Sequence, residues 1–433
     1  MRGGTLGSTR AEETPPLTPT LSPSGEREIT ARRNLAVADS AVKDSRVRRA
    51  LPAVAVGVTL LAVWPASQSA FHEPKRWLFL AAAVFGAILT LPRWRWTALP
   101  LLALTAVQPW RSPEAGLQAL AFAWALTAWP ALQPDLRQFT RIAGVIAALI
   151  SVVVLLQALG LDVLAFASPD AGETRLRLYG TLGNPDFVAS ALLPIAILLL
   201  GPRSSRAESR DPRFLLLLII PALALTRSFA TLLSAIVAAS VLIIIRPPVH
   251  PERSRGALAM NGVLVLVLLT AGLIGRDLGG PIAGRRYLVS VALPHVLDAP
   301  LLGLGLGATV QQWPDWELAY WQARCPDAEC VAADPQKRFA ALQDHVHDDW
   351  LEWLLERGIV GFFALLLALG APLYGAWKDP EHSFLLAAIA AALTRALVDF
   401  PLHRPVDLCL LAGLCALASQ NQLQSSGRAR RHA

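Results

Sequence analysis

The chain has 433 residues, of which 54% are hydrophobic and only 16% are charged, with a formal net charge of +7 at pH 7. A soluble globular protein carries about 25% charged residues. Apolar runs of the length needed to cross about 30 Å of hydrocarbon recur from Leu51 to Ala418. These features exclude one large soluble domain. They predict an all-α polytopic membrane protein, because a chain in lipid has to satisfy its backbone polar groups internally.

The first 49 residues differ in composition from the rest of the chain. Residues 1–49 include the stretch TPPLTPTLSPSGERE, which is rich in Pro, Ser and Thr. Such a segment cannot bury enough apolar surface to offset the entropy that is lost on ordering. No apolar core follows its early charges, so it is not a signal peptide. We expect a disordered cytoplasmic tail.

The apolar runs predict about twelve transmembrane helices. Nine are expected within 50–275 and three within 349–420, with one large loop over 276–348 between the ninth and tenth and a basic tail over 421–433. The expected ranges are 50–66, 77–92, 97–110, 115–131, 141–160, 185–201, 214–226, 229–246, 257–275, 350–376, 383–399 and 404–419.

Basic residues predict the orientation, because short loops with an excess of Lys and Arg stay in the cytoplasm. Twelve spans place both termini and four basic clusters on one side: Arg46, Arg48 and Arg49; Arg203, Arg206, Arg210 and Arg213; Arg246, Arg253 and Arg255; Arg428, Arg430 and Arg431. The loop over 276–348 holds six Lys or Arg against nine Asp or Glu, so we expect it to face outward. Lys75 and Arg76 fall on the outer side in this topology, against the rule.

The cysteines fit this topology. Cys325 and Cys330 lie in the outer loop, where an oxidising compartment permits a disulfide, although spacing alone does not establish one. Cys409 and Cys415 lie inside the twelfth expected span and are expected to act as small apolar residues.

A first polar group, RLRLYGTLGNPD, precedes the sixth expected span. Asn184 and Pro185 fit a simple helix start, with Asn184 as N-cap and Pro185 in the first turn. A role of Asn184 in substrate binding is the alternative. Arg175 and Arg177 are candidate substrate contacts, because the outer loops otherwise contain few cations.

A second polar group, GRRYLVSVALPHVLDAPLLGLGLG, follows the ninth expected span. Arg285 and Arg286 are placed to hold a phosphate at headgroup depth, since a guanidinium is always charged and can bind phosphate oxygens with two bonds. Anchoring to ordinary phospholipid is the alternative. The glycines of this stretch are not a dinucleotide-binding fingerprint, which needs a preceding strand and a cytoplasmic nucleotide.

A third polar group, HVHDDWLEWLLE, begins the tenth expected span. Asp349 and Glu352 fit a capping box, with Asp349 as N-cap. His345 and His347 have no such structural explanation, and a titratable imidazole suits proton transfer from a hydroxyl. A metal site is the weaker interpretation, because two histidines with flanking Asp lack a third, distant ligand. We expect no metal.

A fourth polar group, LVDFPLHRP, lies between the last two expected spans and contributes Asp399, His403 and Arg404. Four separate loops therefore bring Arg, His and Asp to one face of the membrane. Ionisable residues beside apolar spans are costly to place, so they are functional candidates.

In this order, the four groups resemble motifs of the O-antigen ligase and polymerase family of bacterial inner-membrane proteins, from about residue 50 onward. The strongest piece is HDDWL, His347 to Leu351, followed by Glu356, Gly358 and Gly361; Asp348 stands where the family usually has Asn. GTLGNPDFVA, the residues around Arg285 and Asp298, and LVDFPLHRP resemble three further family patterns. The family commonly has T-x-S-R-G at the eighth span, where this chain has Phe229 in place of the arginine.

The resemblance implies transfer of a glycan from a polyprenyl-pyrophosphate carrier to a hydroxyl acceptor, such as the lipid A core, at the periplasmic face of the bacterial inner membrane. His347 is the implied general base, with His345 and Asp349 as further catalytic candidates. Nucleotide, metal and other cofactors are not expected, because the carrier bond supplies the activation. Substrate contacts are expected from Arg285, Arg286, Arg177, Arg175, Asn184, Glu356 and Arg404.

Other activities remain open at the level of sequence. Polymerases of carrier-linked repeats and enzymes that glycosylate exported proteins share these motifs. A transporter of lipid-linked sugar places its polar site near the bilayer midplane on broken, repeated helices, whereas the polar groups here gather at one surface. No nucleic-acid partner is expected.

Overall fold

The computed structural model describes residues 45–67, 69–90, 96–166, 177–201, 212–245, 270, 279–340, 343–379 and 382–420. Residues 1–47 and 48–433 are separate compact units, and the following description concerns the second. Most of the expected N-terminal tail, the ninth expected span and the basic C-terminal tail lie outside the described residues.

The described residues are helical and contain no strand, as the apolar pattern predicts. Residues 48–61 are helical at the first expected span. Helices coincide with ten further expected spans: α2 (Glu73–Thr90), α3 (Leu99–Val107), α4 (Pro113–Ala128), α5 (Leu136–Ala158), α6 (Pro185–Leu199), α7 (Leu216–Leu225), α8 (Phe229–Ile245), α13 (Asp349–Trp377), α14 (Ser383–Arg395) and α15 (Pro405–Ala418).

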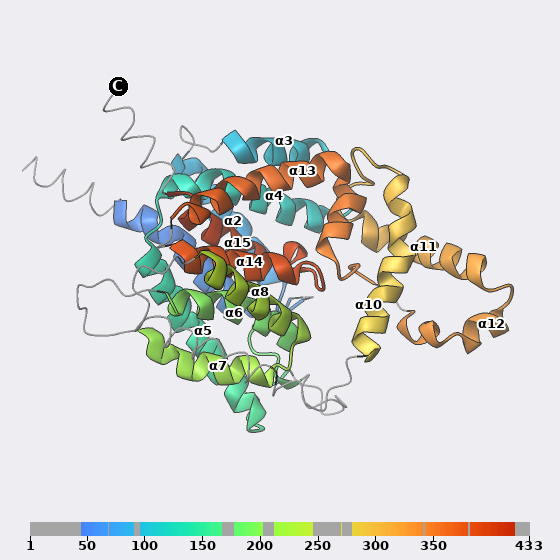
Figure 1. Ribbon diagram of the computed structural model, residues 1–433, viewed down its shortest axis with the longest axis horizontal. Helices are drawn as coiled ribbons and strands as arrows, with labels where there is room; N and C mark the ends of the chain where they lie inside the picture. The colour runs from blue at the N-terminus through green and yellow to red at the C-terminus, as the bar shows by residue number, and fades with distance from the viewer. Residues whose placement is uncertain are drawn as a thin grey trace, which may run out of the picture. The chain divides into compact units, whose positions relative to one another are not determined.

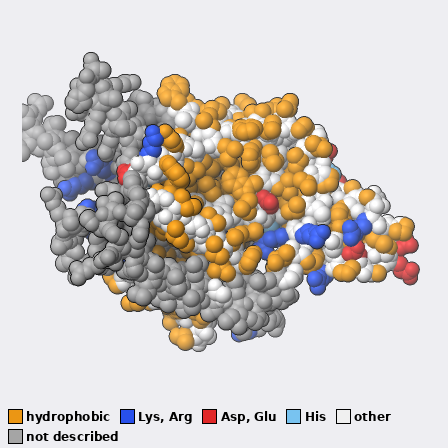
Figure 2. All heavy atoms as spheres, viewed as in Figure 1, with side chains coloured by type: hydrophobic (Ala, Val, Ile, Leu, Met, Phe, Trp, Pro, Cys, Tyr) orange, Lys and Arg blue, Asp and Glu red, His pale blue; other side chains and the backbone are white. Residues whose placement is uncertain are grey.

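Three helical segments are long and apolar enough to cross a membrane, namely Pro113–Leu132, Leu136–Ala158 and Asp349–Trp377. Most of the remaining helices are apolar but shorter. The presence of these helices is therefore established, whereas the number of crossings and their orientation stay predictions. Hydrophobic side chains cover most of the coloured surface of the bundle in Figure 2, as expected for helices that face lipid.

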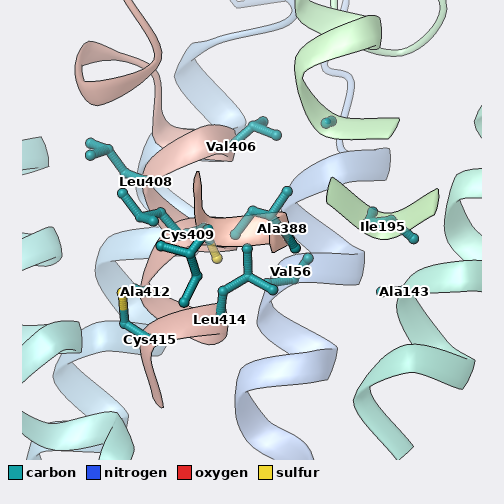
Figure 3. Packing of buried hydrophobic residues seen from close by; sticks show 14 of the residues in the cluster. Val56, Ala143, Ile195, Ala388, Val406, Leu408, Cys409, Ala412, Leu414 and Cys415 are labelled. Carbon is teal, nitrogen blue, oxygen red and sulfur yellow. The ribbon is translucent and has the colours of Figure 1, made fainter. Parts of the chain in front are cut away.

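The bundle is built around α15, which is buried along its whole length (Figures 1 and 3). It packs against α4, α13 and α14, and α14 in turn packs against α6 and α8. Cys409 and Cys415 are buried in this core and take part in no disulfide. The core fixes α15, and the segment that precedes α15 carries part of the candidate site.

Residues 279–340, within the region expected to connect the ninth and tenth spans, contain helices of their own. These are α10 (Gly279–Ala292), η6 (Leu293–Leu297), α11 (Ala308–Arg324), α12 (Ala328–Ala333) and η7 (Pro335–Phe339). Tyr287, Trp313 and Trp321 are buried in an apolar core of this region. Cys325 and Cys330 form a disulfide with a Cα–Cα distance of 5.4 Å. Because aromatic side chains spaced along the region supply this core, no long apolar run marks it in the sequence.

A glycine kink in α13 attaches this region to the bundle. Gly358 has φ 61° and ψ −172°, a conformation that is essentially restricted to glycine. The kink lets α13 bond to the loop before α11: Leu304 N donates to Leu355 O at 2.8 Å, and Ile359 N donates to Pro300 O at 2.9 Å. The first two turns of α13, which carry Glu352 and Glu356, are thereby held in place.

This kink predicts a position-specific effect of adding one methyl group. A Cβ at Gly358 would collide with the carbonyl of Leu301, whereas a Cβ at Gly370 of the same helix would meet no atom within 4 Å. Strain and overpacking should make Gly358→Ala destabilising by about 2 kcal/mol or more. We expect a lower apparent Tm in detergent for Gly358→Ala and little change for Gly370→Ala. Equal melting of the two variants would contradict the role given to the kink.

Candidate active site

Asp348, rather than Asp349, caps the N-terminus of α13. Its carboxylate accepts hydrogen bonds from Trp350 N at 3.1 Å and Leu351 N at 3.2 Å. The expected capping box of Asp349 and Glu352 is therefore wrong by one residue. Because Asp348 satisfies the helix terminus, the carboxylates of Asp349 and Glu352 are available for other partners.

Asp349 joins the start of α13 to the segment between α14 and α15. Its side chain is 0% exposed, and its two oxygens accept a hydrogen bond from Leu402 N at 2.5 Å and face Nδ1 of His403 at 2.5 Å. A buried carboxylate without such partners would be costly. Asp349 does not line the cavity described below. It therefore holds His403 from outside the cavity lining.

Glu352 holds the turn that carries His345. One oxygen lies 2.9 Å from His345 Nδ1, and the other accepts a hydrogen bond from Val346 N at 3.0 Å. The ring of His345 stacks on Phe400, with ring centroids 4.4 Å apart. The turn before α13 is thus fixed on both sides, by a carboxylate and by an aromatic ring.

His347 projects from this turn towards Asp399. Its backbone has φ 59°, in the left-handed region, and its Nδ1 lies 3.8 Å from Asp399 Oδ1. The side chain is 32% exposed, so part of the ring remains accessible. Burial lowers the pKa of His347, Asp399 opposes this effect and Arg285 lowers the pKa further, with a net decrease from its usual value. The ring is therefore neutral near pH 7 and can accept a proton.

Two buried arginines keep Asp399 charged. Arg395 Nε lies 2.9 Å from Asp399 Oδ2, and Arg404 Nη1 lies 3.2 Å from the same oxygen. Burial raises the pKa of Asp399, but Arg404 and Arg395 outweigh burial and lower the pKa well below its usual value. Arg404 also pairs with Asp407 at 2.6 Å. An ionised carboxylate thus faces His347.

A second imidazole, His403, faces a group of carboxylates. Its Nε2 lies 3.8 Å from Glu352 Oε1 and 3.7 Å from Glu356 Oε2, while Asp349 occupies Nδ1. Burial lowers the pKa of His403, but Glu352 and Asp349 more than reverse this effect and raise the pKa well above its usual value. The two environments push the pKa values of His347 and His403 in opposite directions.

One cavity of about 560 Å³ joins these groups. His345, His347 and His403 line one part of it, together with Glu352 and Glu356. Other parts of its wall come from the segment before α2, from α2 itself, from α4 and from the loop before α11. These parts include His72, Arg76, Glu114 and Gln118. The cavity therefore brings imidazoles, carboxylates and guanidinium groups from distant parts of the chain together.

Arg285 lies beside the cavity, not in its lining. Its Nε donates to Val398 O at 2.6 Å, one residue before Asp399. Its charge is among the causes that lower the pKa of His347, so the two groups lie within electrostatic reach. Arg285 from α10 and His347 from the turn before α13 are thus brought together.

Of the other residues predicted from the sequence, some line the cavity and others do not. Glu356 and Arg404 line the cavity, and both are almost fully buried. Asn184 caps α6 by accepting a hydrogen bond from Asp186 N at 2.8 Å, which supports its structural interpretation. Arg286 and Arg177 are exposed and do not line the cavity. Arg175 lies outside the described residues.

Sequence reasoning overlooked the part of the site that lies just before α2, in the first turn of α2 and on α4. Arg76 Nη2 pairs with the carboxylate of Glu114 at 3.0 Å. With the oxygen and nitrogen of its side-chain amide exchanged, Gln118 accepts a hydrogen bond from Arg76 Nε at 3.0 Å and donates one to the carbonyl of His403 at 2.8 Å. Arg76 was visible in the sequence as a cation on the unexpected side of the membrane. That conflict with the positive-inside rule was the available signal.

The arrangement offers two kinds of chemistry. A neutral, accessible imidazole beside an ionised carboxylate can take a proton from a hydroxyl group. Guanidinium groups near hydrocarbon can stabilise developing phosphate charge strongly, because the local dielectric is low. His345, Glu352 and His403 also place three potential metal-ligand atoms within 4.8 Å of one another. Glu352 comes from α13 and His403 from η9 (Pro401–His403), whereas His347 is not part of this group.

The sequence model of the O-antigen ligase family matches residues 214–366 of this chain. The matched range contains Arg285, His345, His347 and Glu356, whereas the motifs before α6 and before α15 lie outside it. No curated protein matches the chain. The match agrees with the motif resemblance and, with the apolar helices, supports a membrane glycan transferase of the ligase or polymerase type. Over residues 214–366, about a third of its length, the chain is similar to the O-antigen ligase family.

Proposed function

We propose that the protein transfers a glycan from a polyprenyl-pyrophosphate carrier to a hydroxyl acceptor at the periplasmic face of the inner membrane. The observation that carries this proposal is the cavity that His347 lines, next to Asp399 and Arg285. The family match over residues 214–366 supports the reaction class. The lipid A core is the acceptor of a ligase, and we take it as the first acceptor to test.

In the proposed reaction, His347 acts as general base. Its imidazole accepts the proton of the acceptor hydroxyl while that oxygen forms a bond to the anomeric carbon of the glycan. The bond from this carbon to the carrier oxygen breaks, and the pyrophosphate leaves with the electron pair. Attack from the face opposite the pyrophosphate inverts the anomeric centre. The carrier bond supplies the driving force, so this step uses no nucleotide and no metal.

Asp399 is the proposed positioning residue for His347. Its Oδ1 lies 3.8 Å from His347 Nδ1, and its Oδ2 is held by Arg395 and Arg404. A modest shift of the ring would close this distance to a hydrogen bond. The carboxylate would then orient the imidazole and stabilise the imidazolium that forms, which is the role of a third group in hydrolase triads.

Arg285 is the proposed cation for the leaving pyrophosphate. Arg404 lines the cavity but is already paired with Asp399 and Asp407. The guanidinium of Arg285 is oriented by two backbone carbonyls, those of Val398 and Pro281, and its charge reaches His347. A guanidinium held near the base is suited to charge that develops on a phosphate.

The first test is removal of the base. His347→Ala should fold and insert, yet lose transfer from a purified polyprenyl-pyrophosphate glycan by about 10²–10⁴-fold, since that is the usual contribution of general-base catalysis. His382→Ala is the matched control, because His382 pairs locally with Asp379 and does not line the cavity. Wild-type transfer by well-folded His347→Ala would remove this histidine from the mechanism.

The second test concerns the cation. Arg285→Ala should lower transfer by about 10²-fold or more, because a stabilising charge near the leaving group is lost. The control is Arg324→Ala, since Arg324 is 49% exposed in a surface pair with Asp334. Equal activity of the two variants, at equal apparent Tm, would contradict the assignment. Separate acceptors in the same assay distinguish ligase, polymerase and protein-glycosylating activities.

A further inference from the structure

Three side chains beside the proposed base, those of His345, Glu352 and His403, form a compact group of metal-ligand atoms, and Glu356 lies next to one of them. His345 Nδ1 lies 2.9 Å from Glu352 Oε1, and His403 Nε2 lies 3.8 Å from the same oxygen. Glu356 Oε2 lies 3.7 Å from His403 Nε2. The four residues come from the turn before α13, from two successive turns of α13 and from η9, and all four line the cavity.

These separations match the size of a metal coordination sphere. Zinc binds imidazole nitrogen and carboxylate oxygen at about 2.0–2.2 Å, so neighbouring ligands of a tetrahedral ion lie about 3.3 Å apart. The observed distances of 2.9, 3.7 and 3.8 Å lie on both sides of that value. The ligand atoms of His345, Glu352 and His403 all lie within 4.8 Å of one another. Glu356 lies farther from part of this set and would join it by a change of its side-chain torsions.

Neighbouring groups hold the candidate ligands in fixed orientations. Asp349 holds Nδ1 of His403 at 2.5 Å, which leaves Nε2 directed at Glu352 and Glu356. A carboxylate behind a ligating imidazole fixes its tautomer and orientation. Val346 N fixes the second oxygen of Glu352, and Phe400 fixes the ring of His345.

The charge balance also favours a bound cation. Asp349, Glu352 and Glu356 are all at most 2% exposed and meet at His403. The buried guanidinium of Arg357, on the same helix, is turned to the Trp353 ring and to Thr105. The charges of Arg404 and Arg357 reach Asp349 and Glu356, and a bound cation would pair the remaining buried carboxylate, that of Glu352.

We infer that His345, Glu352, His403 and Glu356 form a binding site for a divalent transition-metal ion, with zinc as the best-fitting class. Mixed imidazole and carboxylate ligands suit zinc and its neighbours more than Mg²⁺ or Ca²⁺, which prefer oxygen. The bound ion would connect the turn before α13, α13 itself and η9. Its ligand His345 is two positions from His347 in the sequence. The site does not depend on the proposed reaction, and His347 is not one of its ligands.

The test is the metal content of the full-length protein in detergent, measured without substrate. After incubation with Zn²⁺ and removal of loosely bound ions, the wild type should retain about one Zn²⁺ per chain. His403→Gln and Glu352→Gln should each lower retained Zn²⁺ by at least roughly tenfold. His382→Gln, outside the cavity, and His347→Gln, beside the ligands, should retain the wild-type amount.

A second measurement keeps the inference testable if the ligand variants fail to fold. Co²⁺ added to the metal-free wild type should give visible absorption of a four-coordinate site, and Zn²⁺ should abolish it. Metal-free wild type that takes up neither ion would overturn the inference and show that a proton, not a metal ion, neutralises the cluster. His403→Gln that retains as much Zn²⁺ as the wild type would overturn it as well. Loss of transfer in His347→Ala with its metal retained would separate this site from the proposed function.

Discussion

The carboxylate of Asp349 joins two parts of the chain that are distant in sequence, and the geometry of the candidate site depends on this contact. It accepts a hydrogen bond from Leu402 N and faces His403 Nδ1, both at 2.5 Å, while Asp349 N donates to Ala396 O at 2.8 Å. The start of α13 is thereby fixed to both sides of the segment between α14 and α15. Because Asp348 caps the helix instead, Asp349 is free to make this contact. An alanine at position 349 would leave the buried Leu402 N unsatisfied as well as remove the partner of His403, which is the costly way to lose a hydrogen bond.

The two imidazoles on either side of this contact acquire opposite properties from their neighbours. His347 faces a carboxylate that is already neutralised by Arg395 and Arg404, and it feels the charge of Arg285, so burial governs its protonation. His403 faces three carboxylates and therefore holds a positive charge or a metal. One cavity thus contains a neutral proton acceptor and, apart from it, an imidazole that is surrounded by carboxylates. Pairs of titratable groups with divergent environments are typical of acid–base sites.

Much of the fold was predictable because long apolar runs have few alternatives in lipid. Eleven of the expected spans coincide with helices, and the motif order brought Arg285 and His347 to one site. The helical fold of 279–340 was not predictable from hydropathy, since its core consists of spaced aromatic residues such as Trp313 and Trp321. The N-cap was misplaced by one residue because Asp348 and Asp349 are equivalent in a capping pattern. Only tertiary contacts with Leu402 and His403 distinguish them.

Residues that only the fold assembles account for the remaining differences. His403 and Glu352 are separated by 51 positions (403 − 352) along the chain, and no local pattern connects them. Arg76 was recognisable in the sequence only by its conflict with the usual distribution of positive charge. In the structure its side chain lines the cavity. In the predicted topology Arg76 lies on the outer side, where the positive-inside rule does not favour a cation. Within the fold, it pairs with Glu114 and is linked through Gln118 to the carbonyl of His403. Charges that violate a topology rule are therefore informative positions, because they mark where an interaction within the fold outweighs the preference set by the membrane.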